Sequence, residues 1–309
     1  MGEFIMSTRR TFLKQSVIGG GGLALGLFPL DLFASGELVK LTVFHTNDMH
    51  CHIDPFPEDH AEYPGKGGMT RIASLVNTCR EENPNVLLLD AGDMFQGTPY
   101  FNYFKGDLIV KVMSKMGYDG GTIGNHEFDN GMGDILSALS HANFPFVSSN
   151  YDFSDTILSK MVKPYQIVNK GELKIGIYGL GIELDGLVGK LNYGNTRFLN
   201  PLETALKMER FLKKEHSCDL VICLSHLGYS YQSDRISDTA LAPQTKYTDL
   251  FIGGHTHTFL EKPTVLKNTD GKMVIVNQAG WAALSIGKIE FVFDRSGKRK
   301  DPIPVVRNL

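Results

Sequence analysis

Histidine, aspartate and asparagine side chains recur in five short clusters along this chain, and each cluster directly follows a short apolar run. The clusters are Asp48-Met49-His50, Asp90-Ala91-Gly92-Asp93, Gly124-Asn125-His126-Glu127, Ser225-His226 and Gly253-Gly254-His255-Thr256-His257. Imidazole nitrogens mixed with carboxylate and amide oxygens suit zinc, manganese, iron, cobalt or nickel better than calcium or magnesium, which prefer oxygen alone. One Asp-x-His or His-x-His is weak evidence for a metal site, but five such clusters in one chain indicate one.

The spacing within two of the clusters suggests how their side chains reach one point. In an extended segment residues i and i+2 share a face, so Asp48 and His50 would point the same way, and so would His255 and His257. Ligands of open α/β sheets collect outside the carboxyl ends of the strands. We therefore predict that the five clusters converge at one edge of a sheet and form a metal centre.

The apolar runs that precede the clusters alternate with segments of helical periodicity. We predict strands at 38–45, 86–89, 122–123, 144–148, 173–180, 220–224, 250–252, 273–277 and 286–293, and helices at 68–80, 108–116, 135–139 and 201–216. This alternation is typical of a layered α/β domain and argues against a helical bundle or an all-β sandwich. Because the chain has no internal repeat and no long linker, we predict a single catalytic domain over residues 37–309.

Composition excludes several classes of protein. Lys plus Arg is 31 and Asp plus Glu is 34, so the net charge of −3 does not favour a nucleic-acid partner. Hydrophobic residues make up 42% and charged residues 21%, which favours a sizeable core over disorder. The four cysteines lack paired C-x-x-C spacing, so we expect neither a zinc finger nor a disulfide framework.

The first 36 residues are typical of an export signal. Arg9 and Arg10 precede Phe-Leu-Lys and then an apolar stretch at 17–30, which is shorter than the ~20 residues of a membrane-spanning helix. Small residues at 34–36 suit cleavage. We predict a twin-arginine signal over residues 1–36, a periplasmic or otherwise exported product, and no stable membrane span in the mature chain. The alternative is a cytoplasmic protein with a basic tail.

In order along the chain, the clusters resemble the motifs of the calcineurin-like metallophosphatases. The longer strings are similar to those of the bacterial 5'-nucleotidase catalytic domain: Phe44-His45-Thr46-Asn47-Asp48, Gly92-Asp93 with Phe95-Gln96-Gly97-Thr98-Pro99, and Gly124-Asn125-His126-Glu127-Phe128-Asp129. The resemblance covers roughly residues 40 to 295. It implies a four-layer α-β-β-α sandwich with a two-metal centre at one end of the β-sandwich.

The resemblance also implies a role for each site residue. One divalent metal ion would be held by Asp48, His50 and His257, the second by Asn125, His226 and His255, and Asp93 would bridge the two. A water between two such ions becomes hydroxide near neutral pH and attacks phosphorus in line. His126 would stay free of metal, and Asp129 would orient its ring to stabilise the transition state or to protonate the leaving oxygen. The metals would be two of Mn, Zn, Fe, Co or Ni.

The neighbouring residues have simpler interpretations. We expect His45 to be packed beside the site and Cys51 to serve as a small residue. His52 is expected either beside the site or facing substrate. Trp281 is expected in the core, with a substrate-binding role left open.

The function predicted from these residues is hydrolysis of a small phosphoester by an exported dimetal phosphomonoesterase of the 5'-nucleotidase type. Bacterial 5'-nucleotidases carry a second, C-terminal domain that binds the base, whereas this chain ends at Leu309, soon after the last cluster. We therefore expect that a separate chain supplies the specificity domain. The alternatives are a dimetal hydrolase of a thiosulfate-type ester, a phosphodiesterase, and a non-catalytic metal-binding partner protein.

Overall fold

The computed structural model describes residues 38–300, so the predicted export signal at 1–36 lies outside the described part of the chain. Within residues 38–300 no helix combines the length and the apolar character that a membrane span needs. Cys51, Cys79, Cys218 and Cys223 are free thiols in this structure.

Two six-stranded sheets form the centre of the molecule. In spatial order, the first contains β14 (Gly287–Asp294), β1 (Leu38–Thr46), β2 (Val86–Asp90), β3 (Gly120–Thr122), β4 (Phe146–Val147) and β6 (Val162–Lys163). The second contains β12 (Thr264–Lys267), β13 (Met273–Asn277), β11 (Leu250–Gly253), β10 (Leu220–His226), β8 (Leu173–Gly181) and β7 (Tyr165–Lys170). Both sheets are parallel inside, and β14, β12 and β7 pair antiparallel at their edges. A small ribbon pairs β5 (Tyr151–Asp152) with β9 (Arg197–Phe198).

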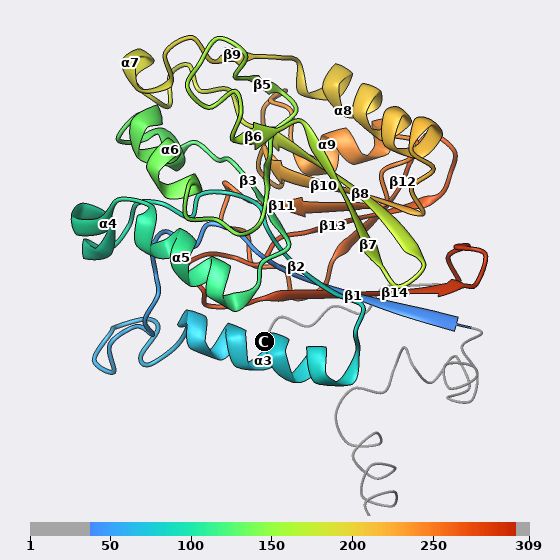
Figure 1. Ribbon diagram of the computed structural model, residues 1–309, viewed down its shortest axis with the longest axis horizontal. Coiled ribbons are helices and arrows are strands. Elements are labelled where there is room, and N and C mark those ends of the chain that lie inside the picture. The colour runs from blue at the N-terminus through green and yellow to red at the C-terminus, as the bar shows by residue number, and fades with distance from the viewer. Residues whose placement is uncertain (1–37, 301–309) are drawn as a thin grey trace, which may run out of the picture.

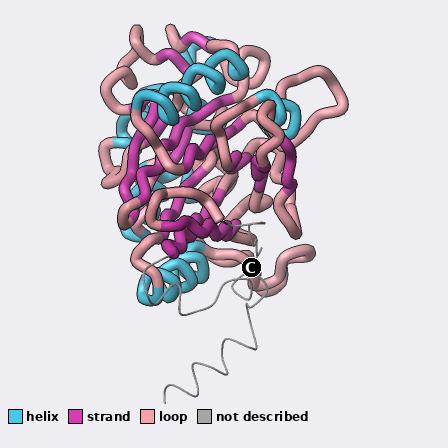
Figure 2. The backbone as a smooth tube through the Cα atoms, turned by 90° about the vertical axis from the view of Figure 1, so that its right-hand side faces the viewer, coloured by secondary structure: helices cyan, strands magenta, loops and turns pink. Residues whose placement is uncertain are grey.

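Helices cover the outer face of each sheet, which gives the four-layer α-β-β-α sandwich (Figure 1; Figure 2). The first sheet carries α3 (Met69–Glu82), α5 (Asp107–Met116) and α6 (Met132–Leu139), and α8 (Pro201–Arg210) and α9 (Asp238–Leu241) cover the second. Shorter helices are α4 (Pro99–Phe104), α7 (Lys190–Tyr193), η2 (His126–Phe128), η3 (Phe211–Glu215) and η4 (Ala242–Gln244). The fold implied by the resemblance is therefore confirmed.

Each central strand is buried on both faces, and this explains its nearly unbroken apolar sequence. In β10, Leu220 and Ile222 face the core between the two sheets, whereas Val221 and Cys223 face the core under α8 and α9. Alternate residues thus enter two different cores. The same pattern in the neighbouring strands fixes which residues meet, because a slip of one position would exchange the two faces.

Three of the parallel strands are each directly preceded by an aspartate, whose carboxylate hydrogen-bonds to the neighbouring strand. The carboxylate of Asp119 accepts a hydrogen bond from Leu88 N at 2.9 Å, and that of Asp219 accepts one from Lys174 N at 2.8 Å. Asp249 repeats the contact with Val221 N at 3.0 Å. These bonds satisfy backbone donors at the strand entrances and help to align the strands, so that their carboxyl ends meet at one side.

The predicted elements differ from the observed ones mainly at the margins. The predicted strand at 122–123 is β3, which ends at Thr122, and the predicted strand at 144–148 shortens to β4. The helix predicted over 201–216 is α8 followed by a π-helical turn, η3. The edge strands β7 and β12 were not predicted from the sequence, because about half of their residues are polar and partly exposed.

Candidate metal centre

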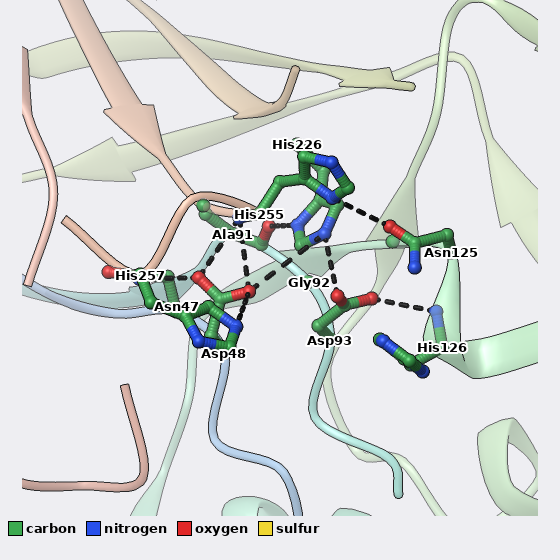
Figure 3. Close-up of polar contacts among 12 residues, drawn as sticks. Asn47, Asp48, Ala91, Gly92, Asp93, Asn125, His126, His226, His255 and His257 are labelled. Atoms are coloured by element: carbon green, nitrogen blue, oxygen red, sulfur yellow. Dashed lines mark hydrogen bonds and ion pairs between the residues drawn. The ribbon is translucent and has the colours of Figure 1, made fainter. Parts of the chain in front are cut away.

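The five polar clusters converge beyond the carboxyl ends of β1, β2, β3, β10 and β11, as predicted (Figure 3). The loops that carry them are tied to one another by backbone hydrogen bonds. Asp48 N donates to Gly92 O at 2.9 Å, and His50 N donates to Asp93 O at 3.0 Å. The loop after β11 joins them through His255 N, which donates to the Asp48 carboxylate at 3.0 Å.

The first group of donor atoms comes from Asp48, His50 and His257, one atom of each lying within 4.8 Å of the others. Asp48 Oδ1 is 3.4 Å from His257 Nε2, and the Nε2 atoms of the two histidines are 3.0 Å apart. His50 Nδ1 lies 3.1 Å from Phe95 O, to which only a protonated nitrogen can donate. The His50 Nε2 lone pair therefore points at the group. Burial lowers the pKa of His50, which favours this neutral, ligating form.

The second group contains Asp93, His226 and His255, again within 4.8 Å of one another. Asn125 belongs with it, because its Oδ1 lies 2.8 Å from His255 Nδ1. His226 Nδ1 donates to Ala91 O at 2.7 Å, so Nε2 is the atom that faces the Asp93 carboxylate at 2.9 Å. That Nε2 is also 3.9 Å from Asp48 Oδ1, which places the two groups side by side.

The residues present fit two divalent cations, and the chemistry around His226 is the clearest sign. Its buried Nε2 makes no hydrogen bond of acceptable geometry although it lies between two carboxylates. Burial lowers the pKa of His226, but Asp93 and Asp48 outweigh burial and raise it to about 10. A proton on this ring thus compensates buried negative charge, as a bound cation would. Burial lowers the pKa of His255 to about 4, which keeps that ring available as a ligand.

The backbone at the site is strained in a way that the sequence did not predict. Asp48, His50, Asp93, His255 and His257 all have positive φ, between 46° and 73°. Side chains other than glycine rarely adopt this left-handed region, and such strain clusters at functional sites. The extended geometry expected for Asp48–His50 and for His255–His257 was wrong, because neither segment is extended. Asp48 and His50 still enter one group, whereas His255 and His257 do not share a face. Their rings enter different groups instead.

Glycines make room for the crowded ligands. A Cβ on Gly124 would lie 2.2 Å from Asp93 Oδ1, and one on Gly254 would lie 2.8 Å from His226 Nδ1. Neither position has space for a methyl group without moving a donor atom. The glycine beside most clusters in the sequence is therefore a steric requirement of the site.

Three buried polar residues fix the loops, namely Glu127, Gln278 and Asn47, and no role was predicted for them from the sequence. The Glu127 carboxylate accepts hydrogen bonds from the backbone nitrogens of Asp93, Phe95 and Gly124. Burial, followed by the nearby Asp93, raises the pKa of Glu127 to about 7. Both Gln278 and Asn47 connect separate loops. The only sequence signal for Glu127 was its place in the Gly-Asn-His-Glu string.

Gln278 and Asn47 hold the loops that carry the ligands. Gln278 Nε2 donates to Gly254 O at 2.6 Å, and its Oε1 accepts from Thr258 N, so both ends of the His255–His257 loop are clamped. Asn47 Nδ2 donates to Asp48 Oδ2 at 2.7 Å and to Gly280 O at 2.6 Å. These bonds set where the carboxylate of Asp48 points.

His126 lies at the open side of the two groups. Its backbone nitrogen donates to Asp93 Oδ1 at 2.8 Å, and its Nδ1 lies 2.8 Å from Asp129 Oδ2. The hydrogen bond with Asp129 is the main cause that raises the pKa of His126 to about 9. The ring is about one third exposed. Such a ring can carry a proton at neutral pH and meet a molecule that approaches the donor groups.

Three of the four neighbouring residues lie close to their expected places, and Trp281 does not. His45 is buried against Asn277, with Nε2 2.7 Å from the amide nitrogen, and Cys51 is buried. His52 is half-buried and stacks on Phe56. Trp281 is not a core residue: it is half-buried at the site and lies parallel to the His257 ring, with ring centroids 5.6 Å apart.

Comparison with known proteins agrees with this geometry. Residues 41–259 match the family model of the calcineurin-like phosphoesterases. The chain is 34% identical over 280 residues to snake venom 5'-nucleotidase from Gloydius brevicauda, covering 84% of this chain and 46% of that protein. It is 32% identical over 292 residues to trifunctional nucleotide phosphoesterase protein YfkN from Bacillus subtilis, covering 84% of this chain and 18% of that protein.

A solved structure shows the same similarity. The 5'-nucleotidase precursor from Thermus thermophilus matches with a TM-score of 0.78 and 34% identity, over 87% of this chain and 54% of that chain. The chain spans about half the length of the curated 5'-nucleotidases it matches. The metallophosphatase family uses two divalent metal ions, in agreement with the two donor groups. The chain belongs to the calcineurin-like phosphoesterase family.

Proposed function

We propose that the chain hydrolyses phosphomonoesters of the nucleotide type at the centre formed by its two donor groups. The observation that carries the proposal is the partly exposed His126–Asp129 pair, which lies beside two adjoining carboxylate–imidazole groups. In this proposal Asp48, His50 and His257 would hold one metal ion, Asn125, His226 and His255 would hold the second, and Asp93 would be shared between them.

Two divalent ions in such a site activate a water molecule and neutralise the phosphoryl oxygens. The chain's own residues supply the rest. Asp93 is placed for bridging by the backbone nitrogen of His126 and by Glu127, which accepts a bond from Asp93 N. The His126 imidazolium, oriented by Asp129, stabilises the transition state or gives a proton to the leaving oxygen. Asn47 and Gln278 keep the ligand loops in place.

The experiment that tests the proposal is a substrate panel on protein reconstituted with manganese or zinc, with metal content measured on the same samples. The panel contains nitrophenyl phosphate, bis-nitrophenyl phosphate, a nucleoside monophosphate and an S-sulfonated thiol. We expect turnover of the monoesters, and an Asp93→Asn control without turnover. Preference for the diester or for the thiosulfate-type ester would replace the proposed reaction by one of the alternatives.

Selectivity for nucleotides, supplied by a separate specificity domain, is part of the same proposal. The half-length match to the 5'-nucleotidases leaves open which surface recognises the base. We expect the chain alone to bind nucleoside monophosphates weakly, and a separate specificity domain to lower their KM much more than that of nitrophenyl phosphate. A micromolar KM for a nucleotide with the chain alone would contradict this part of the proposal.

Export by the twin-arginine route is proposed from residues 1–36 alone. The support is the order of the arginine pair, Phe-Leu-Lys and a short apolar stretch. A fusion of this segment to a reporter should reach the periplasm. The Arg9→Lys, Arg10→Lys variant should retain the reporter in the cytoplasm, and export of that variant would point to another route.

A further inference from the structure

We propose that Trp281 is a positioning residue that holds the His257 imidazole in the direction that metal binding requires. The inference rests on the proposed metal ligands but not on which phosphoester is hydrolysed. It begins from a difference among the ligand rings. His50 and His226 each place Nδ1 against a backbone carbonyl, of Phe95 and Ala91 respectively. Such contacts fix the orientation of a ligating imidazole.

His257 has no such contact with the described part of the chain. Among residues 38–300, the polar contacts of its ring join Nε2 to His50 and to Asp48, which are members of its own donor group. The ring is also 39% exposed, and its backbone has a φ of 51°. An exposed ring on a left-handed backbone needs another restraint to keep Nε2 directed inward.

Trp281 supplies a flat surface at that position. The two rings are nearly parallel, with an interplanar angle of 7° and centroids 5.6 Å apart. A stacked contact between planar rings opposes a rotation that would tilt one ring away from the parallel orientation, and such a rotation would turn Nε2 away. The edge of Trp281 also faces His50, with centroids 6.5 Å apart. The indole therefore contacts both imidazoles of one donor group.

Trp281 is itself held from two sides. Its ring is bordered by His52 at 5.5 Å and by Phe56 at 6.2 Å, both edge-on. The next residue, Ala282, donates its backbone hydrogen bond to Asp48 O at 2.8 Å. The indole is thus tied to the same loop that carries the carboxylate of the donor group, and its position relative to that group is defined.

The consequence is a selective effect on one of two metal ions. Removal of a residue that orients a metal ligand commonly lowers metal affinity by ~10–100-fold. We expect Trp281→Leu to weaken the ion held by Asp48, His50 and His257 by that factor. The second group has no ring contact with Trp281 among the described residues. Its affinity should stay within about threefold, the context-dependent spread of single contacts.

The experiment is a zinc titration of the metal-free protein by calorimetry, which separates two binding steps, with bound metal counted after dialysis. Trp281→Leu keeps much of the apolar volume but has no flat face, whereas Trp281→Phe keeps a flat face. Weak binding in the Leu variant and near-normal binding in the Phe variant are expected. His60→Ala is the matched control, because His60 contacts Phe56 and Tyr63 and has no ring contact with a proposed ligand among the described residues.

A double-mutant cycle with His257→Ala makes the test specific. If Trp281 acts through His257, Trp281→Leu should cause no further loss of zinc affinity once the imidazole is gone. Three results would overturn the proposal: additive losses of zinc affinity in the double variant, equal losses in both binding steps, or zinc affinity of the Trp281→Leu variant equal to that of the wild-type protein. A change in substrate KM with both zinc affinities intact would overturn it too and would assign Trp281 to substrate binding. The zinc-binding readouts need no turnover, so failure of the proposed function would not imitate them.

Discussion

Replacement of His126 separates the chemical step from metal binding. The side chain of His126 points to Asp129, whereas its contact with the bridging candidate Asp93 is made by the backbone nitrogen, which an alanine substitution retains. His126→Ala should therefore keep two metal ions per chain. It should lower kcat for an alkyl phosphate by ~10²–10⁴, the usual range for a lost general acid or base. At 1.36 kcal/mol per factor of ten, that is a barrier increase of ~2.7–5.4 kcal/mol.

Loss of the negative charge of Asp129 should lower kcat less than loss of the His126 ring. Asp129→Asn keeps the 2.8 Å contact with His126 Nδ1 but removes its negative charge. A hydrogen bond to a charged group contributes about 1.5–3 kcal/mol, and solvent screens this one, since both side chains are about one third exposed. We therefore expect about a tenfold loss, between the wild-type protein and His126→Ala.

Leaving-group dependence distinguishes protonation from other roles. The assay compares kcat for nitrophenyl phosphate and for an alkyl phosphate at equal metal content, measured by elemental analysis. The loss in His126→Ala should be much smaller with nitrophenolate, which leaves without a proton. Equal losses for the two substrates would refute the protonation role, and a parallel loss of metal would show that His126 is a ligand.

Two further predictions follow from packing and from burial. Gly124→Ala places a Cβ 2.2 Å from Asp93 Oδ1, so metal content and activity should fall together, whereas Gly133→Ala in α6 meets no atom within 4 Å and should leave both unchanged. Burial raises the pKa of Asp90 to about 8, so the folded state holds a proton that the unfolded state loses near pH 4. The free energy of unfolding should therefore fall as the pH rises from about 4 to about 8. Asp90→Asn should make the decrease in the free energy of unfolding with pH shallower by up to ~1.4 kcal/mol per pH unit. Chemical denaturation at several pH values measures this dependence, and the same dependence in both proteins would contradict the raised pKa of Asp90.

The sequence predicted the location of the site better than its geometry. The five clusters were recognisable because each polar group ends an apolar strand, and the carboxyl ends of parallel strands meet at one side. The extended geometry assumed for His255 and His257 was wrong, since strained left-handed backbone depends on contacts with other loops. Asn47 illustrates this dependence: its hydrogen bond with Ala279 spans 232 positions in the sequence.

The four layers were expected from family resemblance rather than from periodicity. Alternation of strands and helices predicted only a layered α/β domain, because nothing local states which strands share a sheet. Trp281 shows the same limit at the site. Its type favoured a core position, but the loop after β13 places it against His257 instead.

The most direct test of the two-metal account is the Asp93→Asn variant, with metal stoichiometry and turnover measured on the same sample. Asp93 is almost fully buried, and its carboxylate lies 2.9 Å from His226 Nε2. Loss of its charge would leave two cations repelling each other at a site with little solvent screening. The account predicts that bound metal and turnover fall together. Two fully occupied sites with normal turnover in this variant would contradict it.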